Sequence, residues 1–129
     1  MKIADLKDEG ATLFAEQNYP KAAKLLQAAL DLDKSDPEVW ALYFLSINNL
    51  GDRIAATNVF RALGDAIGDD LDKWLEIARL CEAKGNYEGA QHAYTQVIKR
   101  DPMNFALLDK IKELGGKKMQ DGGSLELPV

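Results

Sequence analysis

The 129-residue chain has little of the residue types that most often carry chemistry, with one cysteine (Cys81) and one histidine (His92). A single cysteine excludes an intrachain disulfide, so the sequence is compatible with a reducing compartment. A nucleophilic cysteine also needs a base within hydrogen-bonding reach. Cys81 lies on the apolar side of one predicted helix, and His92 lies off the apolar stripe of the next. We therefore expect no catalytic site.

Long apolar runs and an excess of positive charge are also missing. No segment approaches the uninterrupted run of about 18 apolar residues that indicates a membrane span. The first ten residues, MKIADLKDEG, interleave charges where a secretory signal would have an apolar core. The formal net charge is −5, whereas phosphate binding needs a basic surface. We therefore expect a cytoplasmic protein that does not insert into membranes or bind nucleic acid.

The sequence does contain an internal repeat. Trp40 and Trp74 lie 34 positions apart, and the same offset relates Ala22, Ala56 and Ala90. This period predicts three consecutive units, followed by a half unit that caps them and a flexible tail. The predicted units are 3–36, 37–70 and 71–104, the capping helix is 105–114, and the tail is 115–129.

Each unit carries two helical patterns. In the third unit, four residues spaced by three, one and three positions share one face of the first helix. These residues are Trp74, Ile77, Ala78 and Cys81. Gly85 suits a left-handed helix end, and Pro102 lies where the second helix must stop. At the start of the second unit, Asp36 can cap a helix whose first residue is Pro37.

The third unit reads W-x2-I-A-x2-C…A-x3-Y…P, which resembles the tetratricopeptide repeat W-x2-L-G-x2-Y…A-x3-F…P of the same period. The resemblance covers residues 3–114. It implies an all-α fold, an α-solenoid of stacked antiparallel helix pairs that forms a right-handed superhelix. Small residues such as Gly10 and Ala78 would let paired helices approach closely.

Two stretches depart from the pattern. Gly64 and Gly68 each disfavour a helix by about 1 kcal/mol, so we expect the fourth helix to end near Leu63 and an irregular linker to reach Leu71. That linker is either a tolerated loop or a hinge. The tail ends in SLELPV, which is either a disordered end or a short apolar peptide that docks on this protein or another.

By resemblance, the first helix of each unit lines a concave groove that binds peptides or proteins. The stretch 39–50 is apolar on all sides, and such a helix is usually covered on all sides. Leu42 and Leu45 should therefore be covered, either by a ligand or by neighbouring side chains. The predicted partner-binding residues are Lys7, Ala11, Phe14, Leu42, Leu45, Asn48, Asn49, Leu75 and Arg79.

The sequence thus predicts a non-catalytic adaptor that binds an apolar peptide or amphipathic helix and needs no cofactor or metal. The alternatives are a self-assembling scaffold (a homo-oligomer) and a small chaperone for secreted or assembled subunits. Some members of the resembled family grip a terminal carboxylate through five Lys, Asn and Arg positions. Only Lys7 matches here; the other four positions hold Ala11, Leu42, Asp72 and Glu76. We therefore expect no tight binding of acidic, carboxylate-ended peptides.

Overall fold

The computed structural model describes residues 2–121, and all regular structure within that range is helical. The helices are α1 (Ile3–Ala15), α2 (Tyr19–Leu32), α3 (Pro37–Asn49), α4 (Arg53–Ile67), α5 (Leu71–Ala83), α6 (Tyr87–Arg100) and α7 (Phe105–Asp121). The predicted all-α chain of helix pairs with a capping helix is confirmed. No helix in the described range is long and apolar enough to cross a bilayer.

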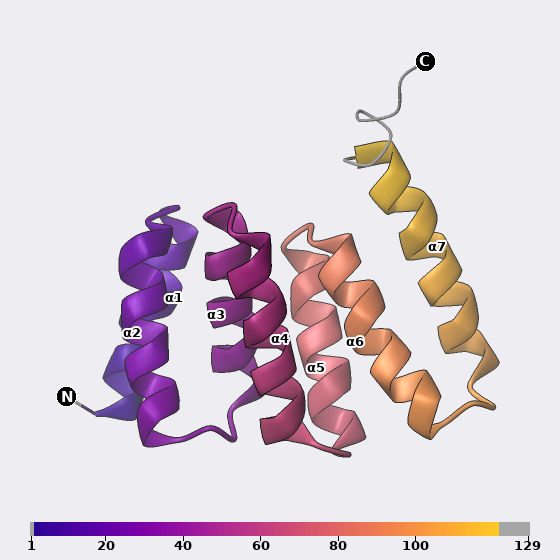
Figure 1. Cartoon of the computed structure of the whole chain (residues 1–129), viewed down its shortest axis with the longest axis horizontal. Coiled ribbons are helices and arrows are strands. Elements are labelled where there is room, and N and C mark those ends of the chain that lie inside the picture. Colours follow the sequence, from indigo (N-terminus) through magenta and orange to yellow (C-terminus); the bar gives the residue numbers. More distant parts are fainter. Residues whose placement is uncertain (1, 122–129) are drawn as a thin grey trace. The chain divides into compact units, whose positions relative to one another are not determined.

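The chain divides into two compact units, Met1–Gly68 and Asp69–Val129. In the first unit α1 packs against α2, α2 against α3, and α3 against α4, while α1 also contacts α3 (Figure 1). In the second unit α6 packs against both α5 and α7 (Figure 1). Each unit therefore contains helices that are neighbours in sequence and in space.

Close helix approach in the first unit depends on Gly10. An ideal Cβ placed on this residue would lie 2.8 Å from Cγ and Cδ2 of Leu26, which is fully buried. The space that a larger residue would fill at position 10 is thus already taken by α2. The predicted role of a small residue at this position is confirmed.

Three turns that join paired helices use the same repeat position. Gln17, Gly51 and Gly85 are each separated by 34 residues, and all three have positive φ, at 63°, 85° and 81°. Glycine adopts this conformation without strain because it has no Cβ. The predicted helix end at Gly85 is confirmed, while the first unit makes the same turn with a glutamine.

Helix starts also follow the repeat. The side chain of Asp36 accepts hydrogen bonds from the backbone N–H groups of Glu38 and Val39, so the predicted cap is confirmed. At the equivalent positions, Asp70 caps α5 and Asn104 caps α7. These caps satisfy backbone donors that have no partner within the helix. The helix boundaries are therefore set by local chemistry every 34 residues.

Trp74, Ile77, Ala78 and Cys81 are all buried in the second unit. This is the face that their spacing predicts. In the first unit, Phe44 and Phe60 meet edge to face with ring centroids 5.5 Å apart. Phe44 occupies the repeat position of Gly10 and Ala78, and this larger residue is accommodated by an aromatic contact between α3 and α4.

Two predicted helix ends were wrong. Helix α4 continues through Gly64 to Ile67 and ends at Gly68, where φ is 62°. Ile67 is buried, and the burial of a large aliphatic side chain, worth about 1.5–3 kcal/mol, outweighs the helix penalty of one glycine. Helix α7 likewise runs past residue 114 to Asp121. The SLELPV segment lies outside the described residues.

Candidate partner-binding residues

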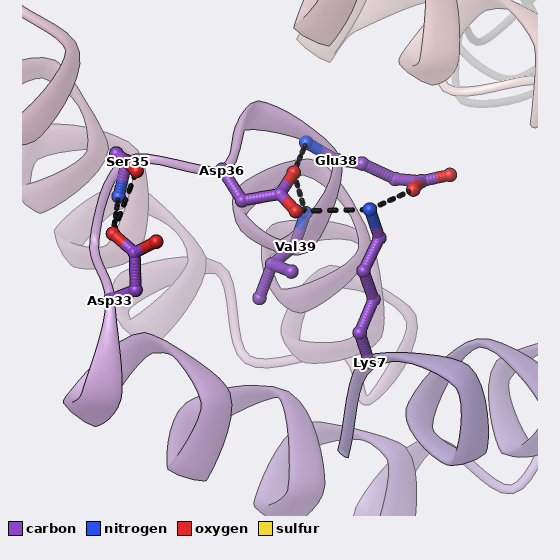
Figure 2. Close-up of polar contacts among 6 residues, drawn as sticks. All are labelled: Lys7, Asp33, Ser35, Asp36, Glu38 and Val39. Atoms are coloured by element: carbon purple, nitrogen blue, oxygen red, sulfur yellow. Dashed lines mark hydrogen bonds and ion pairs between the residues drawn. The ribbon is translucent and has the colours of Figure 1, made fainter. Parts of the chain in front are cut away.

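Lys7 joins α1 to the start of α3 (Figure 2). Its Nζ donates to Oδ2 of Asp36 at 2.9 Å and lies 2.7 Å from Oε1 of Glu38. The other carboxylate oxygen of Asp36 accepts the backbone N–H of Glu38 at 2.9 Å. Asp36 therefore caps α3 and holds Lys7 at the same time.

The electrostatics of this group favour a charged lysine. The hydrogen bond to Glu38 has the largest effect and raises the pKa of Lys7, while burial works in the opposite direction. Asp36 raises the pKa further through its hydrogen bond and its charge. One ammonium faces two carboxylates, so the group carries a net negative charge at neutral pH. An incoming carboxylate would have to compete with both acids for Lys7.

Phe14 and Ala11 are the other predicted site residues on α1. Phe14 is buried and meets Tyr19 edge to face, with ring centroids 5.4 Å apart. Ala11 is half-buried. Phe14 therefore packs between α1 and α2 and does not present an open ring to a partner.

Leu42 and Leu45 of α3 are only 4% and 1% exposed. Other residues of the chain cover both leucines, as predicted, so neither is accessible to a partner as an apolar anchor. The polar end of the same helix is more accessible: Asn48 is half-buried and Asn49 is exposed. Partner binding through these asparagines stays a prediction.

The last two predicted residues, Leu75 and Arg79, lie on α5 in the second unit. Leu75 is half-buried and Arg79 is exposed. Both differ from Trp74 and Ala78, which are their direct neighbours in sequence and lie in the core. The first helix of the second unit therefore has one packed face and one accessible face.

Sequence reasoning missed a polar cluster around Glu82 of α5. Tyr94 of α6 donates its hydroxyl to Oε1 at 3.1 Å, and Lys110 of α7 forms an ion pair with Oε2 at 2.5 Å. Burial pushes the pKa of Glu82 upwards, but the hydrogen bonds from Lys110 and Tyr94 and the positive charges of Lys110 and Lys117 together outweigh it, so the pKa is lowered. The three residues come from three helices and share no motif, so no sequence signal marks the cluster.

The remaining reactive groups do not assemble a site. Burial raises the pKa of the Cys81 thiol to about 12, which leaves almost no thiolate at neutral pH. His92 is exposed, and its Nε2 lies 3.9 Å from Glu88. Among the described residues there is no group of three or more His, Cys, Asp or Glu side chains that could hold a metal ion.

Comparison with solved structures shows that this fold is similar to the fold of known tetratricopeptide domains. The first such domain of Spaghetti (RPAP3), bound to the HSP90 peptide SRMEEVD, is 17% identical with a TM-score of 0.56, and the match covers 89% of this chain and 91% of that one. The Sgt2 domain from Aspergillus fumigatus is 19% identical with a TM-score of 0.57, and the match covers 98% of this chain and 85% of that one. No family model and no curated protein matched the sequence.

Proposed function

Because the chain has the fold of tetratricopeptide-repeat domains, we propose that it is a non-catalytic interaction module for an apolar peptide or amphipathic helix. The fold carries this proposal, since stacked helix pairs commonly present extended surfaces for peptides. The similar Spaghetti domain was solved with a peptide bound to it. In the first unit the partner would contact the accessible sides of α1 and α3, and in the second unit the accessible side of α5.

The polar contacts limit the chemistry of the partner. Lys7 is paired with Asp36 and Glu38, so it offers little attraction to a ligand carboxylate. The neighbouring acids would also repel an anionic chain end. We therefore propose a partner with a neutral or basic contact segment and exclude acidic, carboxylate-ended peptides as tight ligands.

We assign a different binding role to each kind of accessible side chain. Asn48 and Asn49 would hydrogen-bond to the backbone or polar groups of the partner, and Arg79 would fix its orientation. Leu75, which is half-buried, would add an apolar contact. Leu42 and Leu45 are buried, so their part is to support the surface from beneath.

A peptide library displayed on phage tests this proposal. We expect selected peptides to be apolar and to lose at least about tenfold in affinity when Asn49 and Arg79 are both changed to alanine, a loss of about 1.4 kcal/mol. Lys24 is exposed on α2, so Lys24→Ala is the matched control and should bind like the wild type. Peptides that bind both variants equally would place the binding surface elsewhere and refute the assignment.

A self-assembling scaffold is the second candidate. Leu50 and Ile54 flank the turn between α3 and α4, and Ile54 is 78% exposed. Exposed aliphatic residues of this kind can join copies of a chain. Light scattering would give 14.2 kDa for the adaptor and a multiple of it for the scaffold. If the wild type is an oligomer and Ile54→Lys converts it to a monomer, the scaffold is favoured.

A further inference from the structure

Helix α7 has one packed side and one side that the described helices leave accessible. Leu107 and Leu114 are buried where α7 packs against α6 (Figure 1). Within residues 2–121 α7 is the last helix, whereas α5 is followed by α6, which packs on it. The buried Ala78 of α5 has Lys112 as its equivalent 34 positions later, and Lys112 is exposed. A lysine at this position disfavours a further regular helix pair, because that pair would bury its charge.

The accessible side of α7 carries a distinctive set of residues. Spacings of three, one, three and four positions place these residues along one side of the helix. We call them the outer face, and they are Phe105, Leu108, Asp109, Lys112 and Gly116. Phe105 is 62% exposed, Leu108 is half-buried, and the other three are exposed. The outer face thus has an aromatic ring at one end, a residue without a side chain at the other, and two opposite charges between them.

Gly116 has no packing role among the described residues. An ideal Cβ at this position has no atom within 4 Å. At Gly10, by contrast, the Cβ would meet Leu26. Glycine disfavours a helix interior relative to alanine, and Gly116 lies well before the end of α7 at Asp121. The glycine therefore leaves a gap on the outer face that a side chain from another molecule can enter.

We propose that two copies of the chain pair through the outer face of α7, with the two helices antiparallel and related by a two-fold axis. In a two-fold contact each residue pair occurs twice, once in each direction. When the axis is level with the middle of the stretch 105–116, Phe105 of one copy faces Gly116 of the other. In the same arrangement Asp109 of one copy faces Lys112 of the other. One arrangement therefore fills both gaps and pairs both acids with both lysines.

This match favours a second copy over an unrelated partner. The ring and the gap lie equally far from the centre of the outer face, and so do the two charges. A parallel pair would place Asp109 against Asp109 and Lys112 against Lys112, and like charges repel each other. The charges therefore select the antiparallel direction. The contact uses the second unit alone and does not depend on the proposed peptide-binding function.

The dimer should be weak. One pair of short helices buries much less than the roughly 1,600 Å² of a standard interface. We therefore expect sedimentation equilibrium of the full chain to give a mean mass that rises from 14.2 kDa towards twice that value between about 10 μM and about 1 mM protein. A wild type that stays monomeric across this range would overturn the proposal.

Two charge reversals test the antiparallel register. Asp109→Lys and Lys112→Asp should each weaken dimerisation about tenfold or more, because like charges then face each other twice. An equimolar mixture of the two variants should dimerise like the wild type, since every facing pair in the mixed dimer has opposite charges. Variants that dimerise normally when alone, or a mixture that stays monomeric, would overturn the proposed pairing.

A second pair of reversals is the matched control. Lys24 and Asp65 are exposed on α2 and α4, so Lys24→Asp and Asp65→Lys make the same changes in charge outside α7. Each should dimerise like the wild type, both alone and mixed. A loss of dimer equal to that of the α7 variants would attribute the effect to net charge and overturn the contact.

Phe105→Ala tests the contact between the ring and the gap. The ring is largely exposed, so its removal should leave the circular dichroism spectrum unchanged and weaken dimerisation about tenfold or more. Ile54→Lys is the comparison, because Ile54 is 78% exposed but lies on α4, and it should leave this dimer intact. A dimer that survives Phe105→Ala and is lost in Ile54→Lys would belong to the turn between α3 and α4, which would overturn the α7 contact.

Discussion

Lys7 in the first unit and Glu82 in the second each link two helices, and they carry opposite charges. Lys7 on α1 reaches the start of α3, and Glu82 on α5 reaches Lys110 on α7. Both residues join the first helix of one repeat to the first helix of the next. In the first unit a cation lies between two acids, whereas in the second an acid lies between a cation and the phenol of Tyr94.

The comparison teaches that the first helices of successive repeats can be linked through a central cation or through a central anion. The period fixes which helices meet, but it does not fix the sign of the charge between them. The contact of Glu82 should therefore weaken as the pH falls through its folded pKa, and that of Lys7 as the pH rises through its folded pKa. The same freedom appears in packing, because Gly10 and Ala78 share a repeat position but differ by a methyl group.

The largest difference should come from that packing position. Gly10→Ala places a methyl group against the buried Leu26, and we expect it to destabilise the protein by about 1–3 kcal/mol through overpacking. The gain in helix propensity is about 1 kcal/mol, so the expected net loss of stability is up to about 2 kcal/mol. Urea unfolding monitored by circular dichroism would measure the change.

Gly116→Ala in α7 is the matched control. An ideal Cβ at Gly116 has no neighbour within 4 Å, so only the helix propensity changes and stability should rise by about 1 kcal/mol. The same sign for both substitutions would mean that close approach at Gly10 is not a determinant of stability.

A smaller effect is expected at Glu82. The lowered pKa means that its contribution is present above the ordinary value of 4.5 and is lost as the pH falls through the folded pKa. Glu82→Gln should reduce stability by about 1.5 kcal/mol at neutral pH, the scale of a charged hydrogen bond, and by less in acid. Urea unfolding of both proteins at about pH 7 and pH 3 compares them. A difference that stays constant with pH would contradict the ionic role.

Lys7 should show the smallest effect and the opposite pH dependence. Its pKa is raised, so its contribution is complete below the ordinary value of 10.5 and is lost as the pH rises through the folded pKa. Lys7→Met should reduce stability by about 1 kcal/mol or less at neutral pH. Lys24→Met, on the exposed side of α2, should change it less. An equal loss in both variants would mean that the contacts with Asp36 and Glu38 do not stabilise the fold.

Much of the fold could be predicted because its determinants are local. The cap at Asp36 and the turn at Gly85 act within four residues of the backbone groups they satisfy. The end of α4 could not be predicted in the same way. Local propensity stops the helix near Gly64, but burial of Ile67, which depends on tertiary packing, carries it one turn further.

The candidate site was harder to predict for a related reason. The sequence indicates that Leu42 and Leu45 should be covered, but it does not say by what, and the chain itself buries them. The pairing of Lys7 was also missed, although Asp36 was recognised as a cap. A residue can serve two neighbours at once, and sequence spacing reveals only the neighbour on its own helix.

Asp36, Asp70 and Asn104 mark intervals of 34 residues, and each begins a helix with its own side chain. The chain thus has chemically similar helix starts, which we call joints, at regular intervals. A gain or loss of one whole interval leaves every joint with the same chemistry, whereas an insertion of any other length separates a cap from its helix. Length in such a chain can therefore evolve in whole steps, with little disturbance to the residues on either side.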